Sequence, residues 1–402
     1  MNNDWTTCKI GDICKKICSG GTPKSNEPSY YGGNIPWLNT KEINFNRIYN
    51  TEKYITSSGF DNSSAKWIDA NSVIVALYGA TAAKVSINTI PLTTNQACCN
   101  LTIDETVADY RYVYYYLRRN YQHLALLANG GAQQNLNAQQ IKDFNIILPQ
   151  LPIQHKIANI LWTIDDKIEL NRRINDNLEE QAKALFKSWF VDFEPFKGGK
   201  FVDSELGLIP KGWSTGTIYS YIDVIYGAPY KSALFNDKKQ GLPLIRIRDL
   251  KTYTPQYYTK EVLPNTEYVE CGDIIAGMDA EFIPHIWRGE KGVLNQRLCK
   301  FVPKYDYVSK YYIYSLVYPK LAFVQSYKVG TTVSHLGKAD IDRFKVIVPP
   351  EDIIMQYSKI VNSYFAEIVK VSNENQILSS LRDTLLPKLM SGELSVEEVS
   401  LD

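Results

Sequence analysis

The stretch Ile157-Ala-Asn-Ile-Leu-Trp-Thr-Ile-Asp-Asp-Lys-Ile168 decides the fold, because its apolar residues recur in alternate steps of four and three. The same steps continue along the chain and define a seam with two polar positions, made of Ile157, Leu161, Ile164, Ile168, Asn171, Asn175, Leu178, Ala182, Leu185 and Trp189. This is the spacing of a heptad repeat, in which one stripe of a helix packs against a second helix. A helix of about 40 residues would be ~60 Å long.

The same pattern returns near the end of the chain. Its seam consists of Ile360, Tyr364, Ile368, Val371, Asn375, Leu378, Leu385 and Leu389. Neither helix could bury its stripe alone, so we predict an antiparallel coiled coil that holds two domains at opposite ends, with Asn171, Asn175 and Asn375 fixing the register. The alternative is that each helix lies on its own globular domain.

The repetition extends beyond the helices. Asn95-Gln96 returns as Asn295-Gln296, and Ile141-Lys-Asp-Phe144 returns as Ile341-Asp-Arg-Phe344, both displaced by 200 positions. The chain is therefore a tandem duplication with pseudo-twofold symmetry. Two similar modules in one chain favour a partner that offers two sites, and DNA is the leading candidate because half-sites require two readers at a fixed spacing.

Each half reads as an α+β domain with a strand-rich body. Short apolar runs such as Ser72-Val-Ile-Val-Ala-Leu77 are separated by Gly, Pro and Asn clusters, and one helical stretch, residues 109–127, interrupts them. We expect recognition domains at residues 1–150 and 200–349. A central long helix and junction would occupy residues 151–199, and a C-terminal long helix residues 350–402.

Composition limits the possible classes of protein. The 402 residues include 44 basic and 43 acidic ones, a balance that counts modestly against DNA binding but can conceal a basic cleft. No apolar run reaches the length of a membrane span, and the polar start is no signal peptide, so we expect a cytoplasmic protein with no membrane contact. Seven cysteines and four histidines lack the spacing of metal ligands, so we expect reduced thiols and no metal site.

Motifs of catalysis are missing from both halves. The nearest approach to a phosphate-binding loop, Gly20-Gly-Thr-Pro-Lys-Ser25, lacks its second glycine, and no methyltransferase, deaminase or metalloprotease signature appears. An enzyme made by duplication would keep its catalytic residues in at least one half. The sequence therefore predicts a binding protein without catalytic residues.

Several segments carry a resemblance to a known family. Leu185-Phe-Lys-Ser-Trp-Phe-Val-Asp-Phe-Glu-Pro-Phe196 followed by Glu205-Leu-Gly-Leu-Ile-Pro-Lys-Gly-Trp213 resembles the junction before the second recognition domain in specificity subunits of type I restriction-modification systems. Thr384-Leu-Leu-Pro-Lys-Leu-Met-Ser-Gly-Glu-Leu394 resembles their C-terminal ending, and Ser19-Gly-Gly-Thr-Pro23 resembles a motif of their recognition domains. The resemblance covers essentially the whole chain.

The resemblance implies a non-catalytic subunit that reads a bipartite target in double-stranded DNA. It also implies partners: methylation subunits that use S-adenosylmethionine, and a restriction subunit, a motor nuclease that uses ATP and Mg. No cofactor is expected on this chain. Two alternatives stay open, the recognition subunit of a type II system with a fused methyltransferase and nuclease, and a stand-alone DNA-modifying enzyme.

The second domain departs from the family pattern. Tyr226-Gly-Ala-Pro229 replaces the Ser-Gly-Gly-Thr-Pro motif, and Met278-Asp-Ala-Glu281 stands where the first half has Tyr78-Gly-Ala-Thr81. The two domains are therefore expected to read different half-targets. The shared motifs are interpreted as scaffold, with Gly20, Gly21 and Pro23 forming turns and Trp37 in the core.

Direct readout needs side chains with donor or acceptor pairs on loops that reach a groove. Candidates in the first domain are Lys24, Tyr30, Tyr31, Asn39, Lys41, Arg47, Lys84, Gln133, Gln134 and Asn135. Those in the second are Tyr230, Lys231, Arg246, Arg248, Lys251, His285, Arg288, Lys291, Arg297, Thr332, Ser334 and His335. For each, a solvated or scaffold role is the alternative. Trp189 and Phe190 are candidates for contact with a methylation subunit, and burial within the chain is the alternative.

Overall fold

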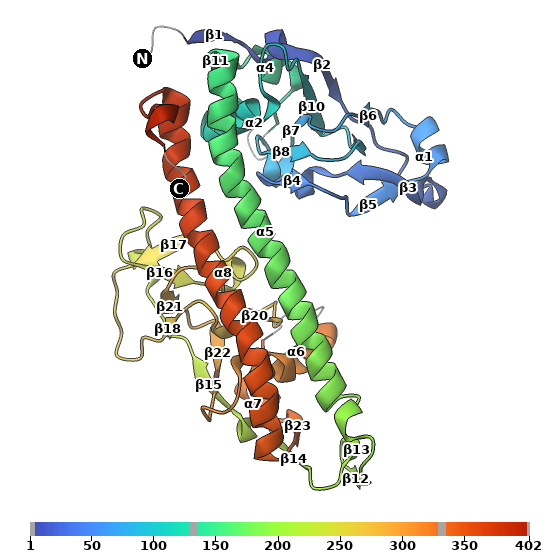
Figure 1. Cartoon of the computed structure of the whole chain (residues 1–402), viewed down its shortest axis with the longest axis vertical. Helices are drawn as coiled ribbons and strands as arrows, with labels where there is room; N and C mark the ends of the chain where they lie inside the picture. The colour runs from blue at the N-terminus through green and yellow to red at the C-terminus, as the bar shows by residue number, and fades with distance from the viewer. Residues whose placement is uncertain (1–4, 129–134, 329–334, 400–402) are drawn as a thin grey trace. The chain divides into compact units, whose positions relative to one another are not determined.

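The computed structural model describes residues 5–128, 135–328 and 335–399 (Figure 1). Its contacts divide the chain into two compact units. Unit 1 comprises Met1–Asp166 and Ser380–Asp402, and unit 2 comprises Lys167–Ser379. The boundary crosses two long helices, so each unit contains a strand-rich body and one part of each helix.

The body of unit 1 contains two main sheets and a terminal strand pair. One sheet has the order β2 (Cys14–Ser19), β10 (Cys98–Ile103), β7 (Val73–Ala76), β8 (Val85–Asn88) and β4 (Arg47–Ile48). The other has the order β5 (Lys53–Ile55), β3 (Tyr31–Leu38), β9 (Leu92–Thr94) and β6 (Trp67–Ile68). β1 (Thr6–Lys9) pairs with β11 (Asn145–Leu148). Every residue of β7 is buried, which explains its continuous apolar run.

The helices of the unit 1 body are short: α1 (Ser57–Asp61), α2 (Tyr110–Arg119), α3 (Tyr121–Leu126) and α4 (Ala138–Asp143). The sequence predicted one helix over residues 109–127, but the structure breaks it at Asn120. Asn120 leaves helical geometry, at φ −91° and ψ 17°, and its Nδ2 donates to Tyr116 O at 2.9 Å. Asparagine side chains compete with the helical backbone in this way, which accounts for the break.

Unit 2 has the same plan. One sheet has the order β15 (Ile222–Tyr226), β22 (Leu298–Pro303), β19 (Ile274–Gly277) and β20 (Pro284–Ile286). The other has the order β17 (Tyr257–Thr259), β16 (Leu242–Ile245), β21 (Gly292–Leu294) and β18 (Tyr268–Val269). β14 (Ser214–Thr217) pairs with β23 (Lys345–Val348), and β12 (Phe201–Ser204) forms a hairpin with β13 (Gly207–Pro210). The body also contains α6 (Lys310–Lys328) and α7 (Lys338–Asp342).

Strand register confirms the tandem repeat. In unit 1 the parallel pair β3–β9 aligns Trp37 with Thr93, and in unit 2 the parallel pair β16–β21 aligns Leu244 with Val293. In both units this parallel pair lies inside a sheet whose other pairs are antiparallel. The predicted α+β class is confirmed.

The two long helices are α5 (Leu151–Phe190) and α8 (Glu351–Ser391), close to the predicted length (Figure 1). In unit 2 their contacts run antiparallel, because Asn171 Nδ2 donates to Glu374 Oε2 at 2.8 Å, whereas Asn175 Nδ2 donates to Ser372 Oγ at 3.1 Å. Glycine ends α8, since Gly392 has φ +72°, the left-handed conformation common just after a helix.

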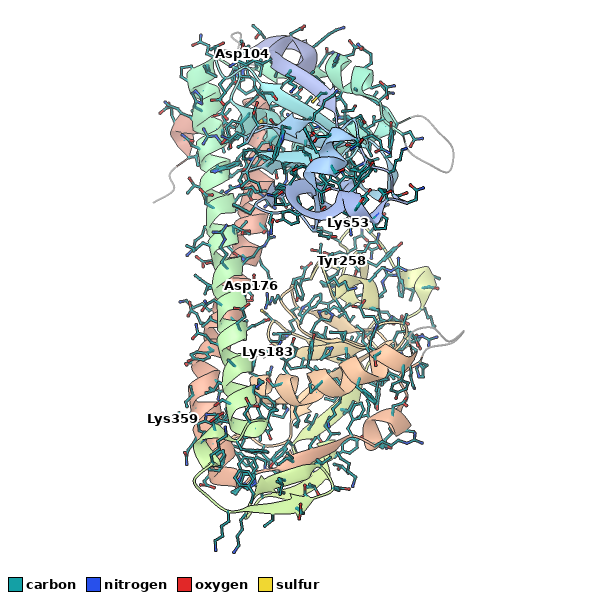
Figure 2. All side chains as sticks on the ribbon, turned by 90° about the vertical axis from the view of Figure 1, so that its right-hand side faces the viewer. Lys53, Asp104, Asp176, Lys183, Tyr258 and Lys359 are labelled. Atoms are coloured by element: carbon teal, nitrogen blue, oxygen red, sulfur yellow. The ribbon has the colours of Figure 1, made fainter. Side chains whose placement is uncertain are left out.

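Exposed positions of the helix pair carry charged side chains as well as apolar ones such as Leu170 and Ile377. Figure 2 shows Asp176 and Lys183 on α5 and Lys359 on α8, and all three are exposed. Opposite charges on exposed helical positions are typical of a solvated face.

The long helices pack in both of the ways considered from the sequence, against each other and against the globular bodies. The core of unit 1 contains Ile157 and Leu161 of α5 together with Leu389 and Met390 of α8, packed with the body. The core of unit 2 likewise contains Ala182 of α5 and helix residues of α8. Each helix therefore packs on its partner helix and on a globular body.

One residue of the predicted α8 seam is wrong, and one further position carries a charged contact. Ile360 is 40% exposed whereas Val361 is fully buried, because the seam continues back from Tyr364 by three residues and not by four. Position 382, which the apolar pattern passes over, holds Arg382, whose Nη1 donates to Asp165 Oδ1 at 2.7 Å. Arg118 of α2 and Asp383 complete this charged cluster of unit 1.

The buried asparagines predict a difference in stability between two variants. Asn175 Oδ1 is buried with no hydrogen-bond partner among the described residues, and Ser372 Oγ also donates to Ile368 O at 2.6 Å. Asn175→Leu should therefore raise the free energy of unfolding by about 1 kcal/mol, as measured by urea denaturation.

The matched control is Asn171→Leu. Asn171 Oδ1 is also buried without a hydrogen-bond partner among the described residues, but Asn171 Nδ2 donates both to Glu374 Oε2 at 2.8 Å and to Asn375 Oδ1 at 3.0 Å, so its loss leaves two acceptors without this donor. We expect no gain in stability, and an equal gain from both variants would contradict this account of the two polar layers.

Candidate nucleic-acid interface

Loops at one end of the unit 1 sheets come together through side-chain and backbone hydrogen bonds. Thr81 Oγ1 donates to Thr40 O at 2.9 Å, Lys84 Nζ donates to Asn44 Oδ1 at 2.7 Å, and Tyr78 forms a β-bridge with Asn135. We call this set the unit 1 edge; it consists of Thr40, Lys41, Asn44, Tyr78, Thr81, Lys84, Ala97 and Asn135. Three sequence candidates, Lys41, Lys84 and Asn135, thus lie in one neighbourhood.

The corresponding loops of unit 2 are joined by charge pairs. Lys251 Nζ lies 3.0 Å from Glu281 Oε1, and Asp279 contacts Arg297 Nη1 at 2.9 Å and His335 Nδ1 at 2.7 Å. We call this set the unit 2 edge; it consists of Arg248, Lys251, Asp279, Glu281, Arg297 and His335. Four of its six members were predicted from the sequence.

A shared backbone ladder shows that the edges are equivalent. In unit 1, Leu77 N donates to Ala97 O at 2.8 Å, and Leu136 N donates to Leu77 O at 2.9 Å. In unit 2, Met278 takes the place of Leu77. Met278 N donates to Arg297 O at 2.9 Å, and Leu336 N donates to Met278 O at 2.7 Å. Tyr78 therefore corresponds to Asp279, which corrects by one residue the expectation that it matches Met278.

Arg47 points away from the unit 1 edge. Its guanidinium forms an ion pair with Asp166 of α5, lies 3.5 Å from the centroid of the Trp162 ring and donates to Trp162 O at 3.2 Å. Only 11% of its side chain is exposed. These contacts fasten the body of unit 1 to α5.

Arg288 and His285 also face the interior of unit 2. Arg288 forms an ion pair with Glu179 of α5, and burial raises the pKa of the Glu179 carboxyl despite that pair. His285 is 16% exposed at its side chain, and its Nε2 lies 4.0 Å from Glu281, too far for a hydrogen bond. Burial lowers the pKa of His285, an effect larger than the opposing attraction of Glu281.

Other candidates have partners within their own domain. Tyr31 Oη donates to Pro23 O at 2.8 Å, the Asn39 side chain accepts from Lys41 N, and Tyr230, which is buried, bonds Thr266 at 3.0 Å. Lys41 pairs with Glu52, Lys291 lies 2.6 Å from Glu270, and the Arg246 guanidinium carbon lies 4.2 Å from the centroid of the Tyr257 ring. Tyr258, labelled in Figure 2, donates to Glu290 Oε1 at 2.7 Å.

The remaining candidates divide into exposed and undescribed residues. Lys24, Lys231 and Arg248 are exposed, and Tyr30 is half-buried. Gln133, Gln134, Thr332 and Ser334 lie outside the described residues. Contact with DNA by any of the candidates stays a prediction.

The shared motifs of the recognition domains act as scaffold. Trp37 is 4% exposed, and its Nε1 donates to Gly21 O at 2.9 Å. A Cβ on Gly20 would lie 2.1 Å from Thr94 O, and one on Gly227 would lie 2.1 Å from Asn295 O. These glycines allow the close approach of two backbones and do not need a positive φ, a different reason from the turn formation that the sequence predicted.

Trp189 and Phe190 lie in an aromatic cluster of unit 2. Phe190 is 7% exposed, and its ring centroid lies 4.9 Å from that of Tyr357 and 6.0 Å from that of Trp213. Trp189 is half-buried beside them. Contact of this pair with a partner subunit stays a prediction.

Asp279 and Glu281 are edge residues that the sequence reasoning missed. The candidates predicted from the sequence include no carboxylate, although Met278-Asp-Ala-Glu281 departs from the corresponding segment of the first half. These two residues could have been predicted from the sequence, because a carboxylate can orient a cationic side chain through a charge-assisted hydrogen bond.

Metal ligation and thiol chemistry find little support among the described residues. Within residues 5–128, 135–328 and 335–399, no group of His, Cys, Asp and Glu could hold a metal ion. Cys98, Cys99 and Cys299 are buried, and burial raises the pKa of Cys99 to about 12, so its thiol stays protonated and unreactive. Across the described helices, none is both long and apolar enough to cross a membrane.

Comparisons with known proteins agree with this architecture. The family model for the type I restriction modification DNA specificity domain matches residues 2–180 and again residues 210–379. The type I restriction enzyme MjaIX specificity subunit of Methanocaldococcus jannaschii is 30% identical over 428 aligned positions, which cover 98% of this chain and 95% of that protein. The HindI specificity subunit of Haemophilus influenzae is 24% identical and covers 66% of this chain and 72% of that protein.

A solved structure shares the fold. The type I restriction-modification S subunit from M. genitalium superposes with a TM-score of 0.52 at 18% identity, covering 97% of both chains. The chain therefore belongs to the family of type I restriction-modification DNA specificity domains. Within that family it is a specificity subunit, the non-catalytic DNA-specificity component of a type I restriction-modification system.

The burial of His285 predicts how stability depends on pH. Its folded-state pKa lies below the unfolded value of about 6.5, so the unfolded state binds more protons between these two values. The free energy of unfolding should fall as pH drops below about 6.5. His285→Gln should weaken this fall, as measured by urea denaturation at pH 7.5 and pH 5.5.

The parent protein, measured at the same two pH values, supplies the control. If His285→Gln and the parent lost equal stability between the two pH values, the buried neutral imidazole would not be the cause.

Proposed function

We propose that this subunit reads a bipartite DNA target, with each recognition domain contacting one half. Residues 1–150 would read the first half and residues 200–349 the second, while residues 151–199 and 350–402 supply the long helices. The observation that carries this proposal is the pair of equivalent edges, which share a backbone ladder but differ in side chains. Two readers built on one scaffold with different chemistry are suited to two different half-targets.

The proposed contacts at each edge follow from exposure and charge. Lys41, Lys84 and Asn135 would serve the first half-target, and Arg248, Lys251, Arg297 and His335 the second. Gln133, Gln134, Thr332 and Ser334 stay candidates because they precede Asn135 and His335 in the chain. Lysines contacting phosphates add affinity for any sequence, whereas amide and guanidinium groups distinguish bases.

Chemistry would come from partner subunits. The proposed partners are methylation subunits that use S-adenosylmethionine and a restriction subunit that uses ATP and Mg, all assembling with this chain in the cytoplasm. The long helices are proposed to dock the methylation subunits. Membership in a family of non-catalytic specificity components supports this division of labour.

The helices are also proposed to set the spacing of the half-targets. Each is continuous across the unit boundary, α5 at residues 166 and 167 and α8 at residues 379 and 380. A helix rises ~1.5 Å per residue, while DNA advances ~3.4 Å per base pair. The non-specific gap between half-targets would therefore depend on helix length.

Reconstitution tests the proposed function directly. The purified chain should transfer no methyl groups to DNA, whereas the chain mixed with its methylation subunit should methylate adenines in one bipartite sequence. The measurement is methylation-sensitive sequencing of treated DNA, with the methylation subunit alone as control. Methyl transfer by the isolated chain, or methylation by the complex without sequence preference, would contradict the proposal.

Inserting one heptad into both helices tests the spacing. The insertions belong after Asp166 in α5 and before Ser380 in α8, where they leave the contacts within each unit intact. The matched insertion should lengthen the helices by ~10 Å and change the gap by about three base pairs, with both half-targets unaltered. Methylated sites of the reconstituted complex would be mapped.

An insertion in α5 alone is the control. It cannot keep both the Asp165–Arg382 pair of unit 1 and the Asn171–Asn375 pair of unit 2 in register, so it should impair folding. A folded, active complex of the matched variant that kept the original gap would show that the helices do not set the spacing.

A further inference from the structure

One position on the shared scaffold changes from a small apolar side chain to a charged one. Ala97 N donates to Asn95 Oδ1 at 3.1 Å, and Arg297 N donates to Asn295 Oδ1 at 3.3 Å, so the same turn presents residue 97 or residue 297. The scaffold itself therefore accepts alanine at this position, and the arginine of unit 2 is not required by the fold.

The neighbours of this position change with it. In unit 1 the neighbours are Tyr78 and Asn135, which form one β-bridge, and in unit 2 they are Asp279 and His335, which form the equivalent bridge. An uncharged set in unit 1 is thus replaced by an ionic set in unit 2. The backbone ladder is the same, so the difference lies in side-chain chemistry alone.

The ionic set has a definite geometry. Asp279 uses both carboxylate oxygens, with Oδ2 2.9 Å from Arg297 Nη1 and Oδ1 2.7 Å from His335 Nδ1. The loop after Asp279 is held by Gln325 of α6, whose Oε1 accepts from Phe282 N at 2.6 Å. Asp279 is therefore fixed by the scaffold, while 58% of the Arg297 side chain stays exposed.

This geometry suits one base. A guanidinium carries five N–H donors in a rigid fork, and the contact with Asp279 involves Nη1, which leaves other donors for a ligand. Guanine presents two acceptors, O6 and N7, in the major groove, and arginine binds both at once. A neighbouring carboxylate aligns the fork before DNA arrives, which improves discrimination between bases.

We propose that Arg297 reads a guanine in the half-target of unit 2 and that Asp279 is its positioning residue. This inference rests on the proposed function, because it requires that unit 2 contacts a half-target. The alternative is that the pair is an ordinary surface ion pair. Such exposed pairs add little to stability, and this pair has no counterpart at the equivalent place in unit 1.

The test uses the full chain in complex with its methylation subunit and DNA in which each target position is varied. The complex with the parent chain should require guanine at one position of the unit 2 half-target. Arg297→Lys keeps the charge but removes the fork, so it should lower the preference for that guanine by about 10- to 100-fold and leave every other position unchanged. Asp279→Asn should weaken the same preference at the same position.

Two further variants separate readout from folding. Arg297→Ala introduces the residue that unit 1 carries at this position, so it should fold with an unaltered thermal transition and also lose the guanine preference. Lys345→Ala removes another exposed ion pair of unit 2, in which Lys345 Nζ lies 3.3 Å from Glu205 Oε1 and 49% of the side chain is exposed. Lys345→Ala should keep the parent pattern.

The outcomes distinguish a failure of the guanine assignment from a failure of the proposed function. Unchanged base preferences in Arg297→Lys and Arg297→Ala, a relaxed position that is not guanine, or relaxation in both half-targets would overturn the guanine assignment while leaving the proposed function intact. Methylation by the parent complex at no bipartite target would refute the proposed function, and the assignment would fall with it.

Discussion

Neither long helix can bury its apolar stripe by itself, and the rest of the molecule depends on that constraint. α5 gives Ile157 and Leu161 to the core of unit 1 and Ala182 and Phe190 to the core of unit 2. Leu389 of α8 completes the core of unit 1, although it lies more than 200 residues from the strands of that unit. Each unit therefore requires both helices for its own packing.

Apolar packing brings the helices together, but polar contacts select their alignment. Burial of hydrocarbon has no direction, so a shift by one turn would cost little without other interactions. The Asp165–Arg382 pair in unit 1 and the Asn171–Asn375 pair in unit 2 each have partners at only one register. Burial lowers the pKa of Arg382, but the attraction of Asp165 and the hydrogen bonds with both aspartates outweigh it, so its pKa lies above the usual value and its charge persists. A misaligned helix would separate that buried charge from Asp165 and leave it with only Asp383, its neighbour on α8.

The heptad spacing and the internal repeat of the sequence predict most of the fold. Heptad spacing predicts both long helices, and motifs displaced by 200 positions predict the duplication. Both patterns can be seen in the sequence without knowledge of tertiary contacts. The predictions that were wrong concern residues whose role depends on local side-chain hydrogen bonds or on contacts with residues distant in the sequence. Asn120 breaks a helix through its own side chain, and Val361 rather than Ile360 faces the core. Arg47 looked like a DNA contact because its partner, Asp166, lies 119 residues away, and no sequence pattern links the two.

The division between fixed backbone and variable side chains explains how one scaffold can carry two edges. Gly20 and Gly227 let two strands approach so closely that a side chain at either position would collide with the neighbouring backbone. The ladder at Leu77 and Met278 then consists of main-chain hydrogen bonds, which do not depend on the side chains beside them. Exchanges such as Tyr78 for Asp279 consequently alter what an edge presents without altering how it is held. Chemistry at the edge can change after duplication while the packing that the helices require stays the same.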